Sequence, residues 1–307
     1  MATFLILHNG KFAKCASHRH MTIEKEVKMK EKLVKLKGNR ILKITDYPGE
    51  KGVILVLHGL TGNCLQLRHY IEEFNPRYRV ISLDFRGRGD SGKAEEDSSI
   101  FEHAKDIQLF IKEFHLTDVI LMGYSMGAFV SALVATNVNL KGLILLDGAG
   151  RMSNHQNKIV EPTFTRLSSQ YLTKEDYILT VTENYKKMGI EISEKLIEAV
   201  SYEVEEKEGY WENKACEKTI RQDWNSFWLF DIRKIGTLLK CPTLLVEATG
   251  NIGSNPPLFL PEDYVDTKKS IQGIQVKVSD ASHYTMVFEK REDIINYINQ
   301  FLNLIEI

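Results

Sequence analysis

A chain of 307 residues with 43% hydrophobic and 26% charged residues has the composition of a globular protein with a sizeable core. Its 40 Lys and Arg residues nearly balance 41 Asp and Glu residues, which disfavours nucleic acid or an anionic membrane as a partner. The apolar runs are far shorter than the roughly 20 residues that span a bilayer, and the first residues lack the features of a secretory signal. Four cysteines without a CxxC pair do not indicate a disulfide framework. We therefore expect a cytoplasmic monomer or homodimer without a membrane span.

The first half of the chain predicts a sheet covered by helices. After a polar N-terminal extension, residues 1–28, two antiparallel strands at 33–37 and 40–45 are expected to turn at Gly38 and Asn39. Short apolar runs separated by helix-length segments then predict strands that are buried on both faces, at 53–57, 80–83, 119–122 and 143–146. This alternation is typical of an α/β fold with a mostly parallel sheet, whose ligand sites lie at the carboxyl ends of the strands.

The alternation stops between residues 151 and 235, which predicts an inserted helical cap. Helical spacing there indicates helices at 175–188, with Thr173 as N-cap, at 194–206 and at 212–227. Two further strands, 243–247 and 274–278, and an amphipathic helix at 292–304 complete the chain. The predicted core domain therefore comprises residues 29–150 and 236–307.

The segment Gly123-Tyr124-Ser125-Met126-Gly127 is a G-x-S-x-G motif between a predicted strand and a predicted helix. In that context the serine lies on a sharp turn that exposes its hydroxyl, while small glycines let the strand and the helix pass closely. Ser125 is therefore the candidate nucleophile, and the amide of Met126 at the helix N-terminus is a candidate oxyanion donor. The alternative is a buried turn serine without a catalytic role.

The segment His58-Gly59-Leu60 follows the strand 53–57, where a loop can supply a second oxyanion amide. We assign that amide to Leu60. His58 itself is interpreted as a structural histidine, because only backbone is needed for this role.

Four motifs together resemble the α/β-hydrolase superfamily: H-G-L-T-G at 58–62, D-F-R-G-R-G-D-S at 84–91, G-Y-S-M-G at 123–127 and S-H-Y at 282–284. The resemblance implies an eight-stranded sheet, a helical cap after the sixth strand, and a catalytic triad in the chain order nucleophile, acid, histidine.

A serine nucleophile needs a base, and His283 follows the last predicted strand, where it can lie beside Ser125. The acid is ambiguous. No carboxylate occupies the loop after the strand 243–247 where the superfamily usually places it. Asp147, directly after the strand 143–146, is preferred, and Glu247, at the end of its own strand, is the alternative.

All three tryptophans of the chain lie in the predicted cap, where aromatic side chains suit an apolar pocket. The predicted pocket residues are Tyr124, Trp211, Trp224 and Trp228. We expect hydrolysis of a small-molecule ester or lactone through an acyl-enzyme on Ser125, without a cofactor. The alternatives are a C–C hydrolase or lyase of the same fold and a slow-turnover ligand-sensing protein. A metal site at Cys15, His18 and His20 is disfavoured, because no fourth ligand is near in the sequence.

Overall fold

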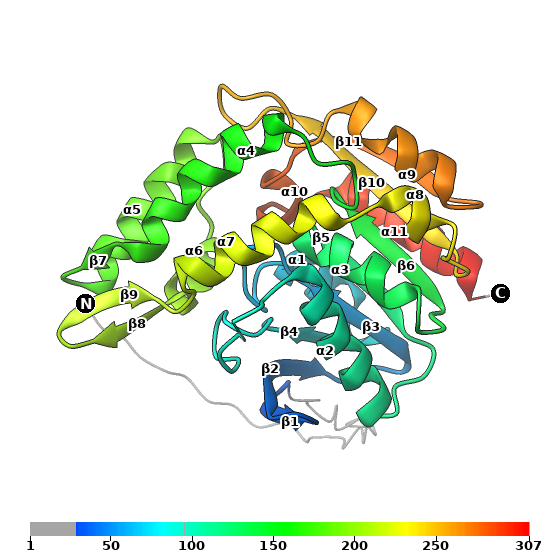
Figure 1. The fold of residues 1–307 in the computed structure, drawn as a ribbon, viewed down its shortest axis with the longest axis horizontal. Coiled ribbons are helices and arrows are strands. Elements are labelled where there is room, and N and C mark those ends of the chain that lie inside the picture. Colours follow the sequence, from blue (N-terminus) through cyan, green and yellow to red (C-terminus); the bar gives the residue numbers. More distant parts are fainter. Residues whose placement is uncertain (1–28, 95, 307) are drawn as a thin grey trace, which may run out of the picture.

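The computed structural model describes residues 29–94 and 96–306, so the predicted extension and the Cys15, His18 and His20 group lie outside the described residues. The central sheet has eight strands: β1 (Lys30–Leu36), β2 (Arg40–Tyr47), β3 (Lys51–Leu57), β4 (Tyr78–Leu83), β5 (Ile120–Tyr124), β6 (Gly142–Leu146), β10 (Thr243–Gly250) and β11 (Gln275–Ser282). Their order across the sheet is β1-β2-β4-β3-β5-β6-β10-β11 (Figure 1). The pairs β1–β2 and β2–β4 are antiparallel and the other neighbours are parallel, which confirms the predicted mostly parallel sheet.

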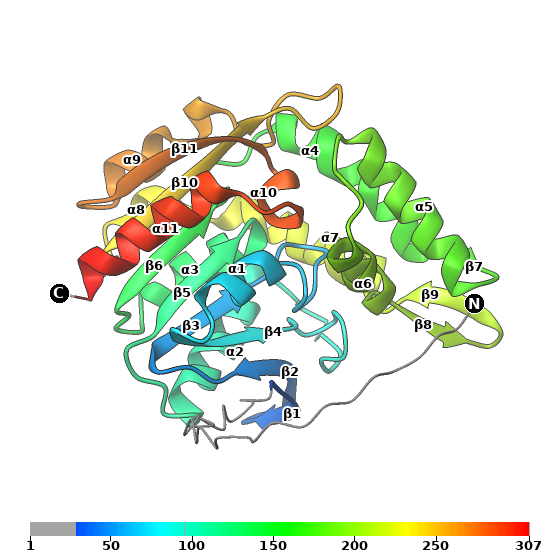
Figure 2. The same ribbon diagram turned by 180° about the vertical axis from the view of Figure 1, so that it is seen from behind.

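Both faces of the sheet are apolar, and each packs against its own set of helices. In β3, Leu55 and Leu57 join one buried cluster, whereas the intervening Ile54 and Val56 join the other. One face is covered by α2 (Ile100–Glu113), α3 (Met126–Ala135), α8 (Ile232–Gly236) and α9 (Val265–Ser270) (Figure 1). The opposite face is covered by α1 (Arg68–Phe74) and α11 (Glu292–Ile305), with the short α10 (Thr285–Phe288) near its upper edge (Figure 2). The strands are apolar at successive positions because both of their faces are buried.

Local signals explain several boundaries. Gly38 and Asn39 have φ of 79° and 61°, so the predicted hairpin turn has two successive residues in the left-handed region. Strands β10 and β11 extend beyond the predicted 243–247 and 274–278, and after a register shift Gly250 pairs with Ser282. This extension brings the chain to the carboxyl edge of the sheet directly before His283.

The chain between β6 and β10 leaves the sheet, and we call residues 151–231 the insert. It contains the helices α4 (Asn154–Val160), η1 (Glu161–Ser168), α5 (Lys174–Lys187), α6 (Glu194–Tyr202), α7 (Glu217–Ser226) and η2 (Phe227–Leu229). It arches over the carboxyl ends of the strands (Figures 1 and 2). Thr173 is the N-cap of helix α5, as predicted, and its side chain accepts a hydrogen bond from the Asp176 amide. The predicted boundary between cap and core at residue 235 stays a prediction. It falls within α8, which packs on α3 and α9.

Part of the predicted helical pattern in the insert is wrong. Residues 204–213 form a hairpin of β8 (Val204–Lys207) and β9 (Tyr210–Asn213), and β7 (Gln170–Tyr171) pairs with β9. Glu208 and Gly209 have φ of 53° and 85°, the left-handed conformation of a two-residue hairpin turn between β8 and β9. The predicted helices 194–206 and 212–227 are therefore shortened to 194–202 and 217–226.

Candidate active site

Ser125 lies on the turn between β5 and α3 with φ of 52° and ψ of −118°, outside the regions that a serine ordinarily occupies. Its amide donates to the Leu146 carbonyl at 2.9 Å, which ties the turn to β6. A Cβ on Gly123 would lie 2.1 Å from the Gly127 carbonyl oxygen, and a Cβ on Gly127 would lie 2.2 Å from the Leu57 carbonyl oxygen. The close passage of strand and helix is therefore the reason for glycine at both positions.

His283, directly after β11, lies between Ser125 and Asp147. Its Nε2 is 3.1 Å from the Ser125 hydroxyl oxygen, and its Nδ1 is 2.6 Å from Asp147 Oδ2. Because an ionised carboxylate only accepts, Nδ1 carries a proton and Nε2 faces the serine hydroxyl as an acceptor. The structure thus brings together the three residues predicted from regions far apart in the sequence.

The Asp147 carboxylate is fully buried and held from several sides. Besides His283, the Ala248 amide donates to its Oδ1 at 3.1 Å and the Tyr264 hydroxyl donates to the same oxygen at 2.9 Å. Burial, followed by the negative charge of Asp147, raises the pKa of Tyr264 well above its usual range, so its hydroxyl keeps its proton and remains a donor. Such donors stabilise an ionised carboxylate away from water.

Glu247, the alternative acid, is not brought to His283. Its side chain forms an ion pair with Lys268 of α9, with a distance of 2.7 Å between Oε1 and Nζ. Asp147 directly follows β6, and Glu247 lies beside it on the adjacent parallel strand β10, where Val246 pairs with Leu146, so their chain positions alone are nearly equivalent. The direction of each side chain separates them: one reaches His283 and the other reaches α9.

Leu60 and Met126, the predicted oxyanion donors, flank the serine on the loop after β3 and at the start of α3. Within the described ranges, neither backbone amide donates a hydrogen bond to another protein group. The Leu60 carbonyl accepts from Arg88 Nε at 3.1 Å, and the Gly59 amide donates to the Gln66 side chain at 2.8 Å. These contacts hold the loop while the Leu60 amide stays available for a ligand.

His58 has a structural environment, in agreement with its interpretation from sequence. Its Nδ1 is 2.7 Å from the Gly59 carbonyl oxygen, and its Nε2 accepts from the Phe85 amide at 3.1 Å. Burial lowers the pKa of His58 to about 3, so the ring is neutral and fully used by backbone partners.

A small cavity of about 50 Å³ opens at Ser125, and it is lined by residues of both the core and the insert. Tyr124 and Trp224 line it as predicted, and Tyr124 also donates a hydrogen bond to the His283 carbonyl at 2.8 Å. The lining also includes aromatic residues outside the predicted pocket set: Phe227, Phe259 and Tyr284. Of these, Tyr284 directly follows His283 in the S-H-Y motif, so its position near the serine could have been predicted from the sequence.

Two predicted pocket residues are corrected by the structure. Trp211 lies on β9 of the small sheet, with the Lys174 ammonium 5.5 Å from its ring centroid, and Trp228 lies in η2 with 45% of its surface exposed. Neither lines the cavity at Ser125. Trp211 is half-buried against an apolar cluster away from the cavity and Trp228 is exposed, which the clustering of tryptophans in the sequence does not reveal.

The described part of the chain contains no group of three or more His, Cys, Asp or Glu residues arranged to hold a metal ion. Among its helices, none is long and apolar enough to cross a membrane.

Comparisons with known proteins agree with this architecture. Epoxide hydrolase 4 of Mus musculus is 32% identical over 91 residues, which are 28% of this chain and 25% of that protein. Putative esterase/lipase 2 of Mycoplasma genitalium is 29% identical over 127 residues, 39% of this chain and 47% of that protein. The matches thus span less than half of these curated relatives.

A solved structure and a family model extend over much more of the chain. The crystal structure of E-2-(acetamidomethylene)succinate hydrolase has a TM-score of 0.76 at 18% identity, covering 90% of this chain and 100% of that one, which shows the shared fold. The family model described as alpha/beta hydrolase fold matches residues 52–289. The chain therefore belongs to the alpha/beta hydrolase fold family.

Proposed function

We propose that the protein is a serine hydrolase that cleaves a carboxylic ester or lactone through an acyl-enzyme on Ser125. The observation that carries this proposal is the continuous hydrogen-bonded series from the Ser125 hydroxyl through His283 to Asp147, with distances of 3.1 and 2.6 Å. A serine hydroxyl is a weak nucleophile at neutral pH unless a base removes its proton as it attacks. Nε2 of His283, 3.1 Å from the Ser125 hydroxyl oxygen, is the proposed acceptor of this proton.

In the proposed reaction, Ser125 Oγ attacks the ester carbonyl while its proton moves to His283 Nε2. The developing oxyanion accepts hydrogen bonds from the amides of Leu60 and Met126. The intermediate collapses, and the alcohol leaves with the proton from His283. A water molecule then attacks the acyl group, His283 accepts its proton, and the free acid and Ser125 are restored.

The insert acts as a cap in this proposal. Val160, Thr163, Trp224 and Phe227 come from the insert and line the same cavity as Ser125. They limit the access of water and supply apolar contacts to the substrate. The names of similar proteins are consistent with ester chemistry, since two matched Mycoplasma proteins are called putative esterase/lipase.

The proposal is tested by labelling with a fluorophosphonate probe and by hydrolysis of 4-nitrophenyl butanoate. We expect the wild type to gain one label by intact mass and to hydrolyse the ester, and Ser125→Ala to lose both. Ser168→Ala is the matched control, because Ser168 is exposed on η1 and lines no part of the cavity at Ser125. Absence of labelling in the wild type would reject a nucleophilic Ser125. Labelling without ester turnover would instead favour the C–C hydrolase, lyase or ligand-sensing alternatives.

A further inference from the structure

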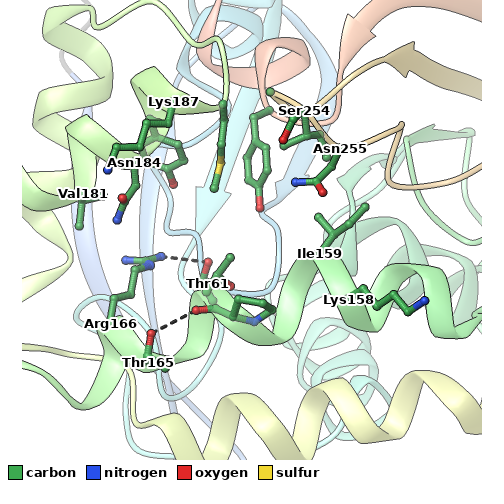
Figure 3. Close-up of a pocket in the computed structure, with 17 residues that line it drawn as sticks. Thr61, Lys158, Ile159, Thr165, Arg166, Val181, Asn184, Lys187, Ser254 and Asn255 are labelled. Carbon is green, nitrogen blue, oxygen red and sulfur yellow. Dashed lines mark hydrogen bonds between the residues drawn. The ribbon is translucent and has the colours of Figure 1, made fainter.

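A larger cavity of about 420 Å³ lies beside the cavity at Ser125, and the two share Thr61, Thr163 and Tyr284 in their linings. Most of its wall comes from α4, η1 and α5 of the insert, and the loop at residues 252–255 forms another side (Figure 3). A molecule bound at Ser125 can therefore extend into this space. The residues that line it indicate what that extension contains.

The charged side chains that line the larger cavity all have the same sign. They are Lys158, Arg166 and Lys187, and none of the described Asp or Glu residues lines this cavity. The Arg166 side chain is 14% exposed, whereas Lys158 and Lys187 are exposed. Arg166 reaches toward Thr61, with Asn184 on the same side of the cavity (Figure 3). A cavity whose charged lining residues are all cations favours a negatively charged group.

The hydrogen bonds of Arg166 leave one edge of its guanidinium largely open. Nη1 donates to Glu203 at 2.7 Å and to Tyr177 at 2.8 Å, while Nη2 donates to the neutral Thr61 hydroxyl at 3.2 Å. In the part of the chain that the structure describes, Nε–H of Arg166 has no acceptor. Arginine commonly binds a carboxylate through two parallel hydrogen bonds.

Another arginine of this protein shows what the Nε–Nη2 edge can bind. Arg79 donates from Nε and Nη2 to the two carboxylate oxygens of Asp46 at 2.9 and 2.8 Å. At Arg166, which lines the larger cavity, the same edge meets only the Thr61 hydroxyl among the described residues. A carboxylate from a ligand would complete there the arrangement that Asp46 completes at Arg79.

We propose that the substrate carries a carboxylate, which binds to the Nε–Nη2 edge of Arg166 and to the Thr61 hydroxyl while its ester carbonyl lies at Ser125. Thr61 directly follows Leu60, whose amide is assigned to the oxyanion. Thr61 also lines both cavities, so we place the carboxylate a few bonds from the reacting carbonyl, as in a monoester of a short dicarboxylic acid. This inference rests on the proposed ester hydrolysis and specifies its substrate class.

The test compares two esters of the same chain length, monoethyl succinate and ethyl butanoate, with acid release followed by pH-stat titration. We expect kcat/KM of the wild type to be at least about 10-fold higher for monoethyl succinate, because a charged bidentate contact is gained. Arg166→Lys keeps the positive charge beside Glu203 but lacks the flat edge, and it should remove most of this preference. Because ethyl butanoate has no carboxylate, its kcat/KM should fall less than that of monoethyl succinate in the same variant, so the ratio of the two values drops.

Two further variants separate the edge of Arg166 from the general charge of the cavity. Lys158→Gln is the matched control, because it removes a lining cation and leaves Arg166 intact, and the preference should persist. If Lys158→Gln and Arg166→Lys reduced the preference equally, the assignment to Arg166 would be overturned. Thr61→Val removes the second proposed contact to the carboxylate and leaves no charge unpaired. It should lower the preference for monoethyl succinate severalfold.

Binding to Ser125→Ala, measured by calorimetry, distinguishes this inference from the proposed function. Binding of monoethyl succinate but not of ethyl butanoate, with no turnover by the wild type, would support the carboxylate subsite and reject ester hydrolysis. Equal kcat/KM for the two esters in the wild type would support ester hydrolysis and reject the subsite.

Discussion

At the scale of single residues, the surroundings of a carboxylate separate two acids that have nearly equivalent positions in the chain. Asp147 accepts from His283, Ala248 and Tyr264 and is fully buried. Glu247 pairs instead with Lys268 of α9. An acid in the triad orients the imidazole and stabilises its charged form, and only Asp147 contacts His283.

We expect Asp147→Asn to lower kcat for 4-nitrophenyl butanoate by about 10³- to 10⁴-fold, because the amide no longer holds the required tautomer of His283. Glu247→Gln is the matched variant on the neighbouring strand and should change kcat less than threefold. Initial rates with purified variants, checked for fold by circular dichroism, measure both. The opposite ranking of the two variants would make Glu247 the acid.

At the scale of elements, the unit β5–Ser125–α3 depends on backbone packing that only glycine permits. The Gly127 position is helical, so alanine there has the better intrinsic helix propensity. The added Cβ would nevertheless lie 2.2 Å from a backbone oxygen of Leu57, an atom that no rotamer change can move. Packing between elements therefore outweighs local propensity at this position.

Gly127→Ala should lower the free energy of unfolding by about 3 kcal/mol, because strand and helix must separate. Gly189→Ala is the contrasting variant, since Gly189 has φ of 83° and no atom within 4 Å of the added Cβ. Its cost comes only from the backbone conformation and should be about 1 kcal/mol. Urea unfolding followed by tryptophan fluorescence compares them, and an equal loss in both variants would contradict the packing explanation.

At the scale of the whole molecule, a buried polar network joins the insert to the core. Asp223 of α7 contacts Arg88 at 2.5 Å and His103 of α2 at 3.0 Å, and it accepts from the Ser98 hydroxyl at 2.7 Å. Although burial opposes ionisation, Arg88 and His103 hold the pKa of Asp223 below its usual range. The same Arg88 donates to the Leu60 carbonyl, so the insert is connected to the proposed oxyanion loop.

Asp223→Asn should lower the free energy of unfolding by about 3–5 kcal/mol, because Arg88 is left buried without its counter-charge. In the folded fraction kcat should also fall, since the Leu60 loop loses a fixed support. Glu183→Gln is the control for an exposed ion pair, that with Lys186, and should change stability by less than about 0.5 kcal/mol. Urea denaturation and steady-state kinetics of both variants test this prediction. An unchanged stability of Asp223→Asn would show that the network does not hold the insert to the core.

The sequence by itself determined the features that depend on neighbouring residues. Alternating or continuous apolar runs predicted all eight strands of the sheet, and Gly38 with Asn39 predicted a turn of the observed kind. The motif around Ser125 and the position of His283 after the last strand predicted which residues meet, because parallel strands end at one edge.

Only the tertiary structure decided the features that depend on side-chain direction. It brought Asp147 rather than Glu247 to His283, and it placed Trp224 but not Trp211 or Trp228 at the cavity. The hairpin at 204–213 and the open edge of Arg166 were also absent from the sequence patterns. The physical reason is that apolar and polar spacing reports which face of an element is buried, whereas partners across elements are selected by packing between residues distant in the chain.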